Sequence, residues 1–133
     1  APPQPSRGTE TILVVEDEES VRALASRVLT AQGYRVLEAS NGREALAIAE
    51  QIDSGIDLVL TDMIMPEMGG VDLVAHIGRL LPDVRVLYIS GYSETDKLQR
   101  GIRDTPEPLL QKPFSAENLA ATVRQALDRA PRL

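Results

Sequence analysis

The chain has 133 residues, a hydrophobic content of 43% and a formal net charge of -6, which together fit one acidic globular domain with its own core. It contains no cysteine, so disulfides, thiolate nucleophiles and sulfur-ligated metals are excluded. The negative charge argues against contact with nucleic acid or an anionic membrane, because both need clustered Lys and Arg. No apolar run approaches the roughly 20 residues that span a bilayer. We therefore expect a cytoplasmic domain, which would also suit the cytosolic part of a membrane-bound protein.

The first ten residues differ in composition from the rest. Residues 1–10 are rich in proline at their start, lack an initiator Met and carry no apolar signal segment. We expect residues 1–10 to be a linker, residues 11–130 to form the folded domain, and the whole chain to be a piece of a longer protein.

After this segment, strand-like and helix-like patterns alternate. Short runs rich in Val, Ile and Leu, typical of strands buried on both faces, predict strands at 12–15, 57–60 and 84–89. A weaker strand is expected at 34–38, and Pro106 and Pro108 favour an edge strand at 108–111. Gly33 is the expected stop of the first helix, and Asn41 and Ser115 are the expected N-caps of the second and last helices. Strands that alternate with helices in this way indicate a single α/β sandwich with a parallel sheet.

Each helical segment has an apolar stripe that should face the sheet. The expected stripes are Val21, Leu24, Val28 and Leu29 in the first helix, Ala45, Leu46 and Ala49 in the second, Val71, Val74, Ile77 and Leu81 in the third, and Leu119, Val123, Ala126 and Leu127 in the last. Segment 94–103 has only Leu98 and Ile102 as apolar anchors, which predicts a short and loosely held helix.

Reactive side chains stand where four of the predicted strands end. Glu16 and Asp17 follow the first strand, Asp62 comes just after the third, and Ser90 and Lys112 follow the fourth and the last. In an open parallel sheet the carboxyl ends of the strands face one crevice, where ligands bind. We therefore expect three carboxylates, a hydroxyl and an ammonium in one pocket, a composition that suits a divalent cation and a phosphoryl group.

Asp62 is the candidate nucleophile, because a carboxylate can attack phosphorus and form an acyl phosphate. An isolated aspartate is more often a helix cap or a turn residue. Its place after a fully apolar strand, opposite a second acidic strand end, favours the chemical role. The Pro66, Gly69 and Gly70 that follow suit a fixed turn.

Glu16 and Asp17 are candidate ligands of Mg²⁺, which prefers one or two carboxylates together with water and phosphate oxygens. Because neighbouring side chains alternate in direction, we expect Asp17 to bind the ion directly and Glu16 to bind it through water. Glu18 and Glu19 are better explained as acids at a helix start, where the dipole favours them.

Ser90 offers a hydroxyl that can donate to a phosphoryl oxygen, and Lys112 offers a mobile positive charge. A Ser-Gly pair is ordinarily a turn and a lysine is ordinarily solvated. Lys112 differs in having apolar residues on both sides, from Leu109 to Phe114. His76, the single histidine, lies in the middle of a helix and is assigned no role.

Together, these motifs from Thr11 to Leu127 resemble the receiver domain of bacterial two-component response regulators. The resemblance implies a flavodoxin-like (βα)5 fold, a three-layer sandwich with a five-stranded parallel sheet in the order 2-1-3-4-5. It implies Mg²⁺-assisted transfer of a phosphoryl group onto Asp62 from a phosphohistidine of a histidine kinase or histidine phosphotransfer domain. It also implies that the carbonyl of Ile64 completes the metal ligands.

The resemblance further implies a phosphoacceptor and not a turnover enzyme, with a weak dimer as an open option. Leu109 departs from the pattern, since receivers often carry Tyr or Phe three residues before the lysine. Residues 89–93 and 110–114, with the Pro-rich start, resemble receivers at the C-terminal end of hybrid histidine kinases, although a stand-alone receiver fits the domain equally well.

Two other readings remain open at this point. A phosphatase of the haloacid dehalogenase type would use similar groups, but its nucleophile belongs to an Asp-x-Asp on the first strand, where this chain has Glu16 and Asp17 side by side. A receiver-like domain that only binds partners ranks last, because all the expected acids and Lys112 are present.

Overall fold

The computed structural model describes residues 8–52, 55–63, 65, 67–90 and 109–129. Along the chain these form β1 (Thr11–Val15), α1 (Glu19–Ala31), β2 (Arg35–Ala39), α2 (Gly42–Gln51), β3 (Leu58–Asp62), α3 (Gly70–Leu80), β4 (Arg85–Ser90), β5 (Leu109–Gln111) and α5 (Ala116–Asp128). The helix expected over 94–103 lies outside the described residues.

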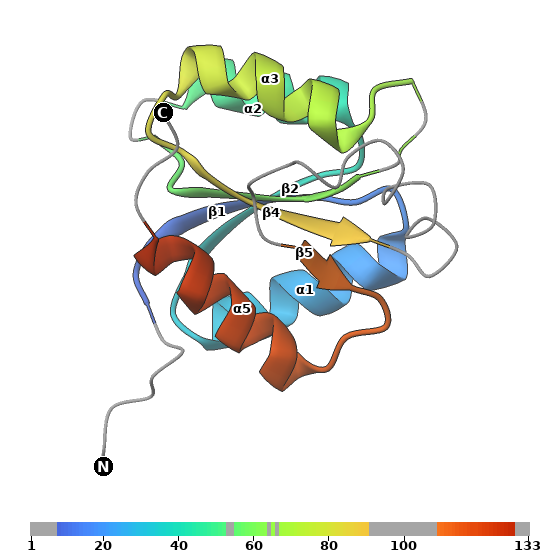
Figure 1. The fold of residues 1–133 in the computed structure, drawn as a ribbon, viewed down its shortest axis with the longest axis vertical. Coiled ribbons are helices and arrows are strands. Elements are labelled where there is room, and N and C mark those ends of the chain that lie inside the picture. The colour runs from blue at the N-terminus through green and yellow to red at the C-terminus, as the bar shows by residue number, and fades with distance from the viewer. Residues whose placement is uncertain (1–7, 53–54, 64, 66, 91–108, 130–133) are drawn as a thin grey trace.

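The strands form one parallel five-stranded sheet in the order β2-β1-β3-β4-β5, as predicted. Helices α2 and α3 cover one face of this sheet, while α1 and α5 cover the other, which gives three layers (Figure 1). The predicted flavodoxin-like sandwich is therefore confirmed in its strand order and its layers.

Alternate residues of the central strands supply the two halves of the core. Successive strand side chains point to opposite faces of a sheet, and Ile12 and Val14 pack in the cluster that includes α1 and α5, whereas Leu13 and Val15 pack in the cluster that includes α2 and α3. Every residue of β3 is buried. This burial on both faces explains why the central strands are continuous apolar runs.

The predicted helix ends are confirmed. Asn41 Oδ1 accepts a hydrogen bond from the Glu44 amide (2.8 Å), and Ser115 Oγ accepts one from the Asn118 amide (3.0 Å). Gly33 follows α1 with a φ of 98°, a left-handed conformation that glycine adopts without steric cost. These local signals fix where the helices begin and end.

Two predicted stripes each include one exposed residue, whereas Leu29 of the first and Val74 and Ile77 of the third are buried as predicted. Leu24 of α1 and Val71 of α3 are 37% and 38% exposed, and Ala25 and Leu73 are buried in their places. One residue rotates a helix face by about 100°, and the small Ala25 side chain lies on the face that packs against the sheet. The last helix buries all four residues of its predicted stripe, Leu119, Val123, Ala126 and Leu127.

The segment before β1 contacts the domain. The Gly8 amide donates to the Gln32 carbonyl (3.1 Å), and the Arg35 amide donates to the Glu10 carbonyl (3.0 Å). Arg124 of α5 forms an ion pair with Glu10 (2.7 Å). Residues 8–10, which the sequence assigns to a linker, therefore run against the turn after α1 and against α5.

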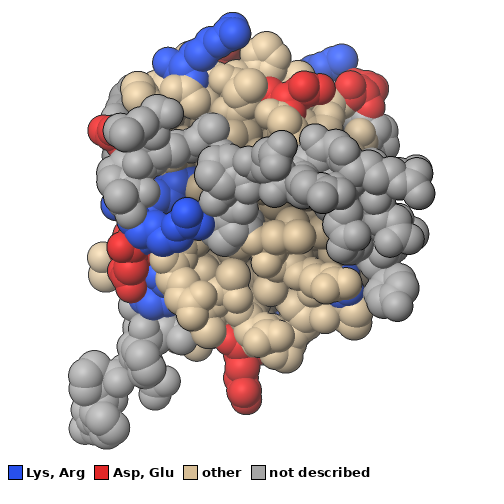
Figure 2. Space-filling model, in the orientation of Figure 1, with Lys and Arg blue, Asp and Glu red and all other residues tan. Residues whose placement is uncertain are grey.

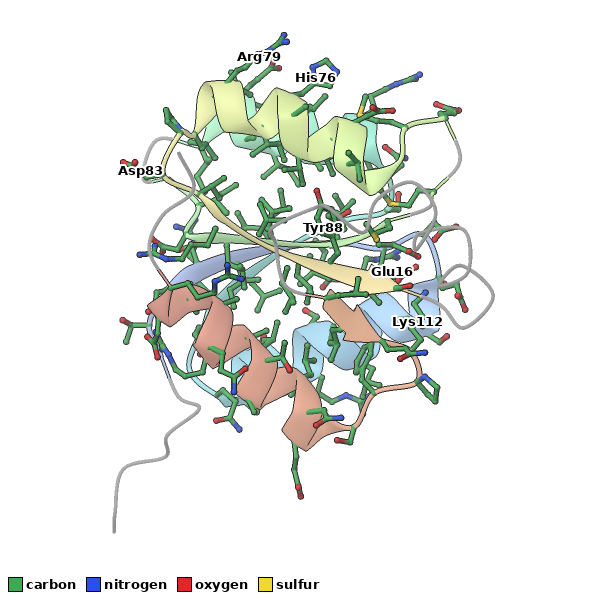
Figure 3. All side chains as sticks on the ribbon, viewed as in Figure 1. Glu16, His76, Arg79, Asp83, Tyr88 and Lys112 are labelled. Atoms are coloured by element: carbon green, nitrogen blue, oxygen red, sulfur yellow. The ribbon has the colours of Figure 1, made fainter. Side chains whose placement is uncertain are left out.

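The outer surface carries mixed charges. Among the described residues on the face in Figure 2, Lys and Arg side chains lie beside Asp and Glu and form no broad basic patch. His76 and Arg79 project from α3 away from the sheet (Figure 3), and His76 is exposed. Within the described ranges, no helix has the length and apolar character needed to cross a membrane.

Candidate functional site

The candidate site residues lie at one edge of the sheet, because parallel strands bring their carboxyl ends together. Thr61 is in register with both Val15 and Tyr88, and Asp62 is in register with Ile89. Glu16 directly follows β1, so it stands at the same level as Asp62. The Ser90 pairing with Gln111 similarly places the end of β4 beside Lys112.

Lys112 connects the acidic groups of this edge. Its Nζ lies 3.1 Å from Glu16 Oε2, 3.2 Å from Asp62 Oδ2 and 3.4 Å from Glu18 Oε1. Figure 3 shows Glu16 and Lys112 close together at the end of the sheet. The Lys112 amide donates to the Ser90 carbonyl (2.7 Å), and its peptide bond to Pro113 is cis. Lys112 therefore links the ends of β1 and β3 by ion pairs with Glu16 and Asp62.

Burial is uneven among these groups. Glu16, Asp62 and Ser90 are 0%, 2% and 0% exposed, whereas Asp17 is exposed. One carboxylate oxygen from each of Glu16, Asp17 and Asp62 lies within 4.8 Å of the others. The site is thus a compact acidic cluster in which Asp17 is the exposed member.

The cluster shifts the proton affinities of its members. Burial raises the pKa of Glu16 above its ordinary value of 4.5, and the neighbouring Asp17 and the charge of Asp62 raise it further. Burial alone would lower the pKa of Lys112, but Glu16 and Asp62 raise that pKa above its ordinary value of 10.5. Both shifts follow from negative charge crowded into a buried site, which favours protons on the carboxylate and on the amine.

The donor set fits Mg²⁺. Three carboxylates close to one another are the hard oxygen ligands that this ion prefers. Glu16 Oε2 is buried and makes no hydrogen bond of regular geometry to the described residues, so its 3.1 Å ion pair with Lys112 compensates its charge. A divalent cation would relieve the remaining repulsion among the carboxylates.

The predicted constellation is brought together as expected for Glu16, Asp17, Asp62 and Lys112, and Ser90 stands at the same strand ends. Ile64, the predicted carbonyl ligand, lies outside the described residues. Leu109, at the position where receivers often carry an aromatic residue, is 47% exposed on β5.

Two residues near the site were missed. Glu18 was read as a helix-start acid, yet it contacts Lys112 from 94 positions away in sequence. Arg22 was given no role, yet its Nη1 donates to the Glu16 carbonyl (2.8 Å). The sequence does hold one signal for both residues. Glu18 and Arg22 are four positions apart, which places them on the same side of the start of α1.

Comparison with known proteins gives consistent matches. The family model described as "Response regulator receiver domain" matches residues 12–124. The chain is 41% identical over 123 residues to the sensor kinase CckA of Brucella abortus (strain 2308), covering 92% of this chain and 13% of that kinase.

Solved structures agree with this match. The receiver domain of the hybrid histidine kinase CckA superposes with a TM-score of 0.75 at 40% identity, covering 89% of this chain and 99% of that one. The Vibrio cholerae chemotaxis protein CheY4 gives a TM-score of 0.77 at 30% identity, covering 90% and 99% of the two chains. These matches lend no support to a haloacid dehalogenase-type phosphatase. The chain belongs to the response regulator receiver domains, which act in two-component phosphorelay signalling.

Proposed function

We propose that Asp62 is the phosphoacceptor of this receiver domain. The observation that carries the proposal is the arrangement around its carboxylate. Asp62 is 2% exposed at the end of β3, Lys112 Nζ lies 3.2 Å from its Oδ2, and the oxygens of Glu16 and Asp17 lie within 4.8 Å. The Asp62 carboxylate is the nucleophile. A cation that can pair with phosphoryl oxygens and a set of metal ligands therefore lie close around it.

In the proposed transfer, a carboxylate oxygen of Asp62 attacks the phosphorus of a phosphohistidine. The new P–O bond forms as the P–N bond breaks, and the imidazole nitrogen keeps the bonding pair and takes a proton from solvent. Lys112, already held by carboxylates, pairs with a phosphoryl oxygen. The Ser90 hydroxyl donates to another phosphoryl oxygen from the adjacent strand end.

The same acids would hold Mg²⁺. We assign Asp17 and Asp62 as direct carboxylate ligands, Glu16 as a ligand through water and the carbonyl of Ile64 as a further ligand by family position. Bound there, the ion would supply positive charge that offsets the repulsion between the carboxylates and the incoming phosphoryl group. The exposure of Asp17 supports access of the ion from solvent.

The chain would serve as an acceptor and switch, and not as an enzyme with turnover. We propose a cytoplasmic location for this domain, and a histidine kinase or histidine phosphotransfer domain as the donor, because receiver domains interact with such proteins. The similarity to a hybrid kinase receiver supports a hybrid kinase as the parent, with residues 1–10 as linker and 11–130 as receiver. The net charge of -6 supports a domain that contacts neither nucleic acid nor membrane, and a weak dimer stays an open option.

The test is phosphorylation by acetyl phosphate with Mg²⁺, followed by intact mass. We expect one added phosphoryl group in the parent chain and none in Asp62→Asn. Asp72→Asn is the matched control, because it removes one carboxylate of the same size from the exposed first turn of α3. It should be phosphorylated like the parent.

Labelling of Asp62→Asn at the parent level would refute the assignment. Steady turnover of a generic phosphate ester would instead favour phosphatase chemistry. Transfer from a phosphorylated histidine phosphotransfer domain, followed by loss of label from the donor, tests the partner class separately.

A further inference from the structure

Arg22 lies in α1 but its guanidinium reaches back to the turn that carries the acidic pair. Its Nη1 donates to the main-chain carbonyl of Glu16 (2.8 Å), and its Nε lies 3.4 Å from Glu38 Oε1. The side chain is 19% exposed. A planar guanidinium can satisfy two acceptors in fixed directions, which an ammonium on a flexible stem cannot.

Glu38 of β2 is itself held from the other side. Its Oε2 accepts a hydrogen bond from Ser26 Oγ (3.0 Å), one turn further along α1. The guanidinium is therefore fixed between a strand and its own helix. A side chain anchored in this way can position the backbone that it contacts.

The turn between β1 and α1 has two further ties. The Glu16 amide donates to the Ala39 carbonyl (3.1 Å), and the Glu18 amide donates to Glu16 Oε1 (3.1 Å). Arg22 adds a hydrogen bond to the Glu16 carbonyl, which belongs to the peptide unit between Glu16 and Asp17. This peptide unit sets the direction in which the Asp17 side chain leaves the backbone.

We propose that Arg22 is a positioning residue for the metal site. It holds the peptide between Glu16 and Asp17 so that their carboxylates stay within 4.8 Å of each other and of Asp62. Arg22 contacts no carboxylate of that cluster through its guanidinium in the contacts described above, so it acts through the backbone. The inference rests on the proposed function in one respect, which is that Mg²⁺ binds this cluster.

A purely electrostatic role for Arg22 predicts the opposite sign. A positive charge near three carboxylates weakens cation binding, so removing it should tighten Mg²⁺. If Arg22 positions the ligands, removing it should weaken Mg²⁺ binding in spite of the more negative site. The direction of the change therefore separates the two accounts.

The experiment is a calorimetric titration of Mg²⁺ into the full chain without any phosphodonor. Arg22→Met should bind Mg²⁺ about tenfold more weakly, within the ~10–100-fold cost of losing a partner that orients metal ligands. Arg22→Lys should also bind Mg²⁺ much more weakly than the parent chain, because a lysine restores the charge but not the paired donors of the guanidinium. Arg27→Met, on the exposed side of the same helix, is the control and should bind like the parent.

A second readout needs no metal. In Mg²⁺-free protein, Arg22→Met should speed hydrogen exchange of the Asp17 and Glu18 amides several-fold and leave the β3 amides unchanged. Unchanged or tighter Mg²⁺ binding in Arg22→Met, or full recovery in Arg22→Lys, would overturn the proposal. If the parent chain does not bind Mg²⁺, the proposed function fails, while the exchange measurement still tests whether Arg22 fixes the turn.

Discussion

Gly70, the first residue of α3, lies so close to the end of β3 that it allows no side chain. A Cβ atom there would meet the Asp62 carbonyl oxygen closer than real Cβ atoms approach any atom, and would lie 3.0 Å from Met63 Cα. The Gly70 amide also donates to the Met63 carbonyl (2.8 Å). Gly70→Ala must therefore move the backbone of Asp62 itself or the start of α3.

The change that Gly70→Ala makes in the free energy of unfolding is the sum of two opposing effects. Alanine at a helix position is favoured over glycine by up to about 1 kcal/mol. Overpacking a rigid site costs about 1–3 kcal/mol, and the upper part of this range applies here because the obstructing atoms are backbone. We expect a net loss of about 1–2 kcal/mol in the free energy of unfolding, which corresponds to a fall of roughly 0.5–1 M in the urea midpoint.

Gly42→Ala provides a matched control. Gly42 is likewise the buried first residue of a helix, but its added Cβ would meet the Met68 side chain, with Sδ at 2.8 Å. A change of rotamer moves Met68 Sδ and Cγ away at low cost, and the remaining contact with Met68 Cβ at 3.1 Å needs only a small shift. This variant should therefore be within about 0.5 kcal/mol of the parent. Urea unfolding followed by circular dichroism measures both, and phosphorylation by acetyl phosphate should slow in Gly70→Ala alone. A Gly70→Ala domain as stable as Gly42→Ala would refute this account of the helix–strand contact.

Two further predictions concern the acids. Asp17→Asn should lose more Mg²⁺ affinity than Glu16→Gln, because a direct ligand costs more than a ligand through water; a calorimetric titration giving the reverse order would exchange their roles. Arg124, through its hydrogen bond, holds the pKa of Glu10 below its ordinary value of 4.5. The ion pair therefore stabilises the fold above pH 4.5 and loses this effect as the pH falls through the lowered pKa. Urea midpoints across this acid range should converge for the parent chain and Glu10→Gln, and a constant difference would contradict the assignment.

Much of the site was accessible from sequence, because chemistry and strand ends coincide along the chain. Glu16, Asp17, Asp62, Ser90 and Lys112 each stand at or just after an apolar run, and parallel strands bring such positions to one edge. The helix caps Asn41 and Ser115 were equally predictable, because a cap is satisfied within a few residues of itself.

The tertiary structure decided the contacts that cross elements. Whether Leu24 or Ala25 faces the core depends on how closely α1 approaches a twisted sheet, and a period of 3.6 residues does not fix that rotation. The contact of Glu18 with Lys112, the reach of Arg22 to the Glu16 carbonyl and the approach of Gly70 to Asp62 are likewise set by packing between elements. The sequence determines which groups reach the edge of the sheet, because the end of each strand can be read from the few residues around it. Their supporting contacts depend on distances between elements, which exist only once the layers have packed.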